Sequence, residues 1–342
     1  MSKSINKKTH KKGIIIAASI IIGILLTVGV VSYIYVDNMM NKINYEQPNE
    51  EIDDPQNTAD PNELIDPENI ITEPNQTPQP NLPVEQPTTI RENTKDIQNI
   101  LLIGVDRRNS SWNGNSDSMV ILTLNKATKE VKLSSIMRDS YVYVPNKGFS
   151  KINYAYAVQG PNLLMDTIKH NFGIKIDNYV CVDFNAFKNI VDVIGGISVN
   201  LSADEIAVFK NTKGKFAAGA GTYSLTSQEA LTYVQNRSVG RWDFDRTMRQ
   251  RKVLSILFDE FKGKDIFALN NVLSSTLPYV KTNFTKTELL SFVLLANGFK
   301  GSKVQEFRIP MDGSYTTSVA NNYIMIMDME KNTRELQKFI FG

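Results

Sequence analysis

A run of 24 consecutive residues without a charge, GIIIAASIIIGILLTVGVVSYIYV at 13–36, is the feature that most limits how this chain can fold. A helix rises about 1.5 Å per residue, so this run is long enough to cross a hydrocarbon core about 30 Å thick. A cleaved signal peptide is the alternative, but its apolar region usually has about 7 to 15 residues and ends at a small-x-small site, which 31–40 lacks. We therefore predict a transmembrane helix at 13–36.

The charges on either side of this run predict its orientation. Asp37 follows it, and five lysines precede it: Lys3, Lys7, Lys8, Lys11 and Lys12. Positively charged flanks stay in the cytoplasm, so we expect a basic cytoplasmic head at 1–12 in a single-pass protein of the cell membrane. Everything after residue 36 is then extracellular.

The segment at 37–98 has the composition of a linker. It holds nine of the 13 prolines and 14 acidic residues against three basic ones. So few apolar residues cannot offset the entropy of ordering the chain, and we expect a disordered stalk. Prolines and like charges extend such a linker. The remaining residues, 99–342, are expected to fold as one domain.

The charge and the rare residue types of 99–342 restrict its chemistry. This part has 30 basic and 22 acidic residues, although the whole chain is only +2, and the surplus suits an anionic ligand. Cys181, His10 and His170 are the only cysteine and histidines in the sequence. The sequence therefore has no disulfide framework, no Cys/His zinc site and no obvious histidine general base. Carboxylates, Arg, Lys and a metal ion remain.

The hydrophobic pattern of this part predicts a layered α/β domain. Apolar runs at 100–105, 119–124 and 131–137 predict three strands, and 153–171 predicts a helix that Gly160-Pro161 could divide. A strand at 179–184, a helix at 186–194 and a strand at 197–201 follow. From Ser227 onward we expect mainly helices.

Helical projections assign individual cations to the core or to solvent. In the helix predicted at 243–262, the apolar stripe passes through Arg246 and Gln250, whereas Arg251 and Lys252 fall on the opposite, solvent-facing side. The preceding helix begins at the capping box TSQE, and Arg237 projects in line with its inward residues. An inward arginine needs an anionic partner, because an unpaired buried charge is very costly.

Charged residues also recur where the predicted strands end. Asp106 follows the first strand and Asp117 precedes the second, so both carboxylates lie at one rim if the strands are neighbours. Mg²⁺ suits two such carboxylates in a site open to water and phosphate oxygens, although isolated acids there are more often turn residues or caps. Arg138-Asp139 ends the third strand, and Lys151 opens the next helix. Several converging cations suggest a phosphate cradle.

Seven segments in order make the sequence resemble a known family. They are NILLIGVDRR, NSDSMVILTLN, VKLSSIMRDSYV, KINYAYA, NYVCVDFNAFKNIVDVIGGISVNL, SQEALTYVQNR and DFDRTMRQRKVL. Their order and spacing are similar to the landmarks of the LytR-CpsA-Psr family, over roughly 99–257. A basic head, a membrane span and an outer domain also suit that family.

This resemblance implies a three-layer α-β-α extracellular domain on a Gram-positive-type membrane. It implies an Mg²⁺-dependent phosphotransferase that moves a glycopolymer, such as teichoic acid or capsule, from a polyprenyl-pyrophosphate carrier to a peptidoglycan sugar hydroxyl as a phosphodiester. The metal carboxylates of the family fall on Asp106 and Asp117. Its pyrophosphate-binding residues fall on Arg138, Lys151, Arg237, Arg246 and Gln250. Asp139 either orients Arg138 or helps to deprotonate the acceptor.

Two positions depart from the family pattern. Asn115 and Gln235 stand where family members commonly have arginines. Neutral side chains donate hydrogen bonds without adding charge, so binding should weaken unless Arg107, Arg108 or Arg241 substitutes. We therefore expect a working enzyme with an altered preference for its donor.

Two other functions are open to a chain of this kind. The missing cations favour a non-catalytic protein that binds polyprenyl phosphate or cell-wall polymer as a scaffold or regulator, whereas the retained acids and cations favour the enzyme. A transcription regulator fits poorly, because the predicted cytoplasmic part has about a dozen residues, too few for a DNA-binding domain. We expect no nucleic-acid partner.

Overall fold

The computed structural model describes residues 44–45, 89, 91, 94–106, 114–209, 214–261, 275–285, 288–289, 291–292, 295, 298–318 and 323–342. All of them belong to the compact unit that spans 44–342. The predicted cytoplasmic head, the predicted membrane span and most of the predicted stalk lie outside these residues. Among the described helices, none combines the length and the apolar character needed to cross a membrane.

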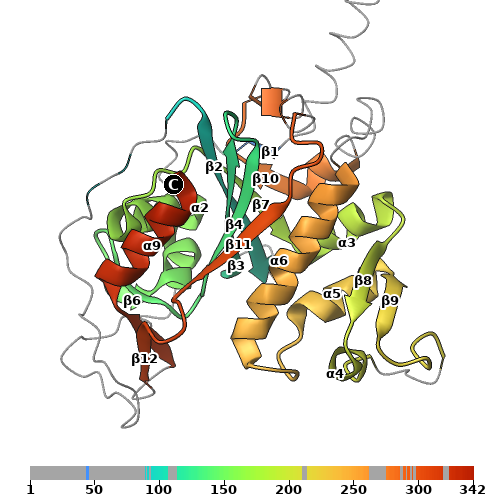
Figure 1. The fold of residues 1–342 in the computed structure, drawn as a ribbon. Helices are drawn as coiled ribbons and strands as arrows, with labels where there is room; N and C mark the ends of the chain where they lie inside the picture. Colours follow the sequence, from blue (N-terminus) through green and yellow to red (C-terminus); the bar gives the residue numbers. More distant parts are fainter. Residues whose placement is uncertain are drawn as a thin grey trace, which may run out of the picture. The chain divides into compact units, whose positions relative to one another are not determined.

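A mixed β-sheet forms the centre of this unit (Figure 1). In the described part of the chain, seven strands pair in the order β1-β10-β7-β2-β3-β4-β11. Their bounds are β1 Asn44–Tyr45, β2 Ile97–Asp106, β3 Asn115–Asn125, β4 Glu130–Ile136, β7 Asn178–Asp183, β10 Val280–Thr282 and β11 Val304–Ile309. The pairs β2·β7 and β4·β11 are parallel, whereas β2·β3 and β3·β4 are antiparallel. The carboxyl ends of β2, β4, β7 and β11 therefore lie at one rim, together with the start of β3.

Helices α2 and α9 cover one face of the sheet. Alternate strand residues, such as Ile103 and Met119, pack against α2 (Ile152–Phe172) and α9 (Met329–Phe341) in the largest core cluster. The predicted break in the first of these helices is confirmed, since Gln159 and Gly160 leave the helical conformation before Pro161. The small hairpins β5–β6 (Tyr141–Val144 and Gly148–Lys151) and β12–β13 (Tyr315–Ser318 and Ile324–Met327) adjoin this side.

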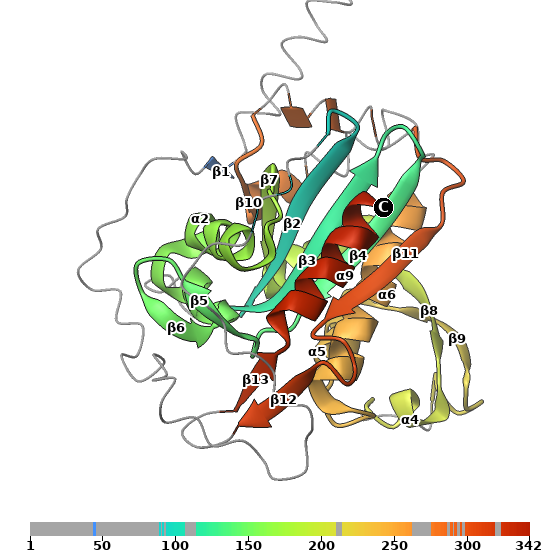
Figure 2. The same ribbon diagram turned by 60° about the vertical axis from the view of Figure 1, so that its left-hand side comes forward.

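Helix α6 (Trp242–Phe261) lies on the opposite face, as Figures 1 and 2 show. Its Phe258 packs with Leu122 and Leu124 of β3. A second core cluster joins α6 to α3 (Phe184–Val193), α5 (Ser227–Gln235) and the hairpin of β8 (Ile197–Leu201) and β9 (Gly221–Leu225), beside the short helix α4 (Ala203–Ile206). Helices on both faces of one sheet confirm the predicted α/β class.

The part after Ser227 is mainly helical, as predicted, through α5, α6 and α9, but it also contributes the short 3-10 helix η3 (Leu277–Tyr279) and strands β10 to β13, which the sequence did not predict. One sequence prediction about this unit is wrong. Arg251 does not face solvent. It is only 7% exposed, its Nε lies 2.9 Å from Oε2 of Glu306 on β11, and its Nη1 donates to Ser135 Oγ on β4. Helix α6 is packed on two sides, so a single apolar stripe does not define its buried surface.

Candidate functional site

A β-bulge directs Asp117 toward the α6 face of the sheet. Gly104 of β2 pairs with Ser118 and Val105 pairs with Ser116, so Asp117 is the extra residue between them. Without the bulge, Asp117 would share a face with Met119, whose side chain packs toward α2. Bulges commonly redirect a side chain next to an active site. Asp106 ends β2 opposite Asn115, so both predicted metal carboxylates lie at the same rim.

Arg138 follows β4 at this rim and contacts three carboxylates. Its Nη1 donates to Asp117 Oδ1 at 2.5 Å, and its Nε lies 3.4 Å from Asp139 Oδ2 and 3.2 Å from Asp243 Oδ2. Burial alone would lower the pKa of Arg138, but the three carboxylates outweigh it and raise the pKa. Arg138 therefore keeps its charge in a largely dehydrated position.

Arg246 and Arg237 approach the same carboxylates from α6 and from the connection before it. Arg246 is 3% exposed, as the helical projection predicts, and its Nε lies 3.3 Å from Asp243 Oδ1. Its Nη2 also donates to the carbonyl oxygen of Asp117 at 3.2 Å. Burial lowers the pKa of Arg246 to about 10, although Asp243 opposes this shift. Arg237 Nε lies 3.1 Å from Asp243 Oδ1.

The position of Arg237 differs from its prediction. Helix α5 ends at Gln235, so Arg237 lies beyond the helix and its side chain is 41% exposed instead of facing inward. Arg249, which is 2% exposed, fixes the connection between α5 and α6 by donating from Nη2 to the carbonyl oxygens of Asn236, at 2.7 Å, and Val239. Arg237 therefore reaches the rim from an immobilised loop.

Asp139 and Lys151 extend this network along the rim. Lys151 Nζ lies 3.7 Å from Asp139 Oδ1, and both residues are buried. Burial raises the pKa of the Asp139 carboxyl above its usual value, although Arg138 and Lys151 act in the opposite direction. The charged cluster of Asp117, Arg138, Asp139, Lys151, Arg237, Asp243 and Arg246 is thus continuous.

The charged cluster is incompletely satisfied by its own members. Four of its residues are cations and three are anions. Arg138 Nε, Arg246 Nε and Asp243 Oδ1 are buried without a hydrogen bond of good geometry within the described structure, although ion pairs surround them. These Nε groups are therefore held by ion pairs instead of well-directed hydrogen bonds. The cluster keeps one more cation than anion, and an anion with several acceptor oxygens, such as a pyrophosphate, would suit this surplus.

The comparisons with known proteins agree with this chemistry. The model of the LytR-CpsA-Psr family matches residues 56–339. The chain belongs to the LytR-CpsA-Psr family.

Among its relatives is the polyisoprenyl-teichoic acid–peptidoglycan teichoic acid transferase TagU of Bacillus cereus. The two sequences are 36% identical over 221 residues, and this match covers 63% of this chain and 69% of the relative. The transferase of the same kind named TagT, from Bacillus subtilis, is 33% identical over 56% of this chain and 61% of its own. A solved structure of the LytR-CPS2A-psr family protein YwtF (TagT), with bound octaprenyl pyrophosphate lipid, superposes with a TM-score of 0.57 at 26% identity, covering 76% of this chain and 98% of that one.

The remaining family positions take less part in the charged cluster. Gln250 lies one turn beyond Arg246 on α6, and its side chain forms none of the hydrogen bonds seen among the described residues. Asn115 pairs with Asp106 in the strand register, and Gln235 is an exposed residue at the end of α5. Arg241 binds Asp245 and Asp312 instead of joining the cluster, and Arg107 and Arg108 lie outside the described residues.

Sequence reasoning missed Asp243, the carboxylate that contacts Arg138, Arg237 and Arg246. An aspartate in the first turn of a helix is ordinarily explained by the helix dipole, which hides any other role. The sequence did contain evidence for a role of Asp243. In the segment DFDR, Asp243 and Arg246 are three residues apart, so they share one face of α6.

Asp106 and Asp117 fit a magnesium ion by the chemistry of their side chains. Mg²⁺ commonly takes one or two carboxylates and completes its shell with water and substrate phosphate oxygens. In the described residues no group of three or more His, Cys, Asp or Glu side chains gathers as a metal cluster. A dedicated protein cage is therefore absent from this part, and Asp106 and Asp117 are the residues that would hold the ion.

Proposed function

We propose that this protein transfers a glycopolymer of the teichoic acid class from a polyprenyl-pyrophosphate carrier to a sugar hydroxyl of peptidoglycan. The charged cluster carries this proposal, because three arginines and a lysine converge on one rim and outnumber the three carboxylates among them. The relatives named as teichoic acid transferases, and the related structure that holds octaprenyl pyrophosphate, support the same substrate class.

The proposed reaction breaks a phosphoanhydride bond and forms a phosphoester bond. The acceptor oxygen forms a bond to the phosphorus that carries the polymer, and the bond from that phosphorus to the bridging oxygen breaks. Polyprenyl phosphate leaves, and the acceptor hydroxyl loses its proton. Arg138, Arg237 and Arg246 neutralise the pyrophosphate and stabilise the charge that grows on the departing phosphate. Asp243 and Asp117 hold these guanidinium groups in position.

Asp106 and Asp117 would hold Mg²⁺ in this proposal. The bound ion would supply Lewis-acid stabilisation of phosphate oxygens. Asp139 has two candidate roles, because it contacts Arg138 and also has a raised pKa that suits a proton acceptor. We also propose that residues 13–36 anchor the protein in the cell membrane with this domain outside, where peptidoglycan lies.

A transfer assay with the full chain in detergent tests the proposal. The donor is a polyprenyl-pyrophosphate-linked teichoic acid, the acceptor is a peptidoglycan oligomer, and mass spectrometry detects the phosphodiester product. We expect product with Mg²⁺, none with a chelator, and a loss of at least about 100-fold for Arg138→Ala, the scale of one lost electrostatic contact in a transition state.

Arg334→Ala is the matched control. Arg334 is 60% exposed on α9 and pairs with Glu330 and Glu335 at the surface, so its loss should leave the rate unchanged. Tight donor binding without product, under conditions in which a relative such as TagU forms product, would support the non-catalytic binder instead.

A further inference from the structure

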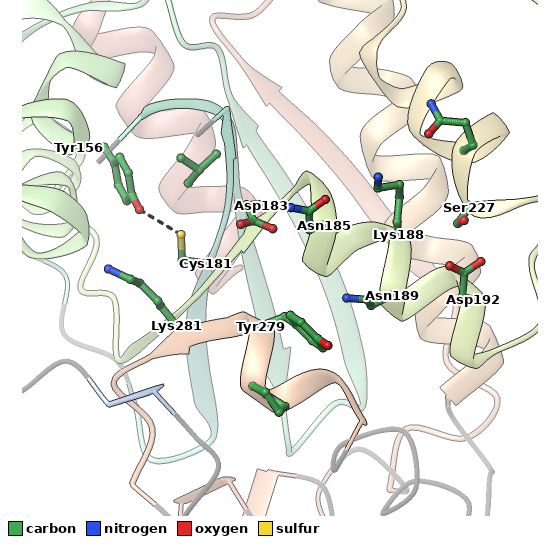
Figure 3. A pocket seen from close by; sticks show the side chains of 13 residues that line it. Tyr156, Cys181, Asp183, Asn185, Lys188, Asn189, Asp192, Ser227, Tyr279 and Lys281 are labelled. Carbon is green, nitrogen blue, oxygen red and sulfur yellow. Dashed lines mark hydrogen bonds between the residues drawn. The ribbon is translucent and has the colours of Figure 1, made fainter. Parts of the chain in front are cut away.

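A polar cavity of about 770 Å³ lies beside the charged cluster at the same rim (Figure 3). Helix α3 and the start of α5 form one side of it, and η3 with β10 forms the other. Asp183, at the end of β7, lines the cavity and pairs in register with Val105, the neighbour of Asp106. Adjacent strands are about 4.8 Å apart, so the cavity begins about one strand from Asp106 and two from Asp117.

Helix α3 turns a polar stripe into this cavity. Asn185, Lys188, Asn189 and Asp192 recur at helical spacing, whereas Val191 on the other face packs in the core. No hydrogen bond or ion pair in the described structure occupies these four side chains. Even Lys188 and Asp192, four residues apart and oppositely charged, do not pair there. The stripe therefore presents uncommitted donors and acceptors.

A solvated helix face would present a similar stripe, but this one borders an open cavity whose other side comes from η3 and β10. Tyr279 and Lys281 come from a segment about 90 residues away; the Tyr279 ring points toward α3 across the cavity, whereas Lys281 extends toward Cys181 and Tyr156 (Figure 3). Tyr279 is 52% exposed, so its ring is available to a ligand. An exposed aromatic ring opposite a polar stripe matches a sugar ring, which has an apolar C–H face and a rim of hydroxyl groups.

The charges of the cavity exclude the other ligands of the proposed reaction. Lys188 and Lys281 are balanced by Asp183 and Asp192, so the cavity lacks the cationic surplus that a second phosphate would need. A polyprenyl chain would remove water from these polar groups without replacing their hydrogen bonds. A saccharide supplies paired donors and acceptors, which is what asparagine amides and a hydroxyl group bind.

We propose that this cavity binds the acceptor glycan strand of peptidoglycan. The proposal rests on the proposed transferase function. The cations that suit the pyrophosphate lie over β3, β4 and α6, while the cavity lies over β7 and β10 on the other side of Asp106. An acceptor held in the cavity would therefore approach the phosphorus from the side opposite the arginines, as an in-line displacement requires.

The test is Asn185→Ala/Asn189→Ala in the full chain, with Asn200→Ala as a matched control on the exposed edge of β8. We expect the double variant to raise the KM for a peptidoglycan glycan oligomer about tenfold, as two lost hydrogen bonds would, and to leave the KM for the lipid-linked donor unchanged. Tyr279→Ala should act in the same way, and Tyr279→Phe should retain most of the acceptor affinity.

Calorimetric titration without donor measures binding independently of catalysis. The glycan oligomer should bind wild type and Asn200→Ala alike, and the double variant about tenfold more weakly. An active wild type with unchanged acceptor KM in the double variant would overturn the proposal, and so would a raised donor KM, which would assign the cavity to the donor polymer. If wild type forms no product, the proposed function fails, and the titration alone still decides whether the cavity binds the glycan.

Discussion

Asp243 holds three arginines together, and its removal should expose how much of the charged cluster depends on one carboxylate. We predict that Asp243→Asn lowers the free energy of unfolding by about 3–5 kcal/mol, because buried Arg246 loses its counter-ion. Inorganic pyrophosphate should restore much of this loss by supplying the missing negative charge. Thermal unfolding of the full chain in detergent, with and without pyrophosphate, measures both effects.

Asp204→Asn is the control for that experiment, since Asp204 is an exposed first-turn residue of α4. Its melting temperature should stay near that of wild type. If pyrophosphate stabilises wild type and Asp243→Asn to the same extent, the anion does not bind among these arginines.

Asp139 should reveal its role through the pH dependence of the reaction. Burial raises the pKa of its carboxyl, and only the deprotonated form can accept a proton, so kcat should fall as the pH drops through a value above that of an ordinary aspartate. Asp139→Asn should abolish this acidic limb and lower kcat by about 10²–10⁴-fold. A variant that keeps the limb and loses only donor affinity would show that Asp139 positions Arg138.

At the level of single residues, the sequence could identify most of the charged residues at the rim, but it could not show which of them pair with one another. Strand ends placed Asp106, Asp117 and Arg138 together, and helical periodicity placed Arg246 inside. The bulge that turns Asp117 is a shift in the pairing of β2 with β3. The pattern of residues along one strand does not reveal such a shift. Asp243 shares α6 with Arg246, but its contacts with Arg138 and Arg237 join residues far apart in the sequence, and periodicity along one helix does not show them.

Helix α6 allows a direct test of how elements are held together. Arg251 and Lys252 are neighbours that the helical projection placed on one solvent face, but Arg251 joins α6 to Glu306 and Ser135 while Lys252 donates to the carbonyl oxygen of Asn200 at the surface. We predict that Arg251→Ala lowers the free energy of unfolding by about 3 kcal/mol, the lower limit for a buried pair, because Glu306 remains 35% exposed.

Lys252→Ala should cost less than about 1 kcal/mol, as exposed interactions do. Equal losses in the two variants, measured by denaturant unfolding, would mean that the Arg251 contacts do not stabilise the packing of α6. The longer elements before residue 261 could be predicted because their apolar patterns are long, whereas β5, β6, α4 and β9, with four or five residues each, were not predicted. The later strands are short, and β12 and β13 have four residues each, so their pattern is too brief to separate from a helix.

At the scale of the whole molecule, charge is divided between parts with different tasks. The basic surplus lies in 99–342, whereas the acidic residues are concentrated in 37–98. Within the folded unit, the cations of the charged cluster and the balanced charges of the polar cavity lie on either side of Asp106. The composition predicts the basic surplus of 99–342. It could not show that the charged cluster and the charge-balanced cavity are separate, because the cavity forms only when α3, η3 and β10 meet.

This separation of the charged cluster from the cavity predicts a selective response to salt. Raising sodium chloride from about 0.05 to 0.5 M shortens the Debye length to about 4 Å, so attraction between the arginines and an anionic donor should weaken. We expect the KM for the lipid-linked donor to rise several-fold, and the KM for an uncharged glycan acceptor to stay nearly constant because the cavity has no net charge. Initial rates at fixed Mg²⁺ provide both values. Parallel increases in the two KM values would show that both substrates depend on the same cations, and the separation of donor and acceptor across Asp106 would then be wrong.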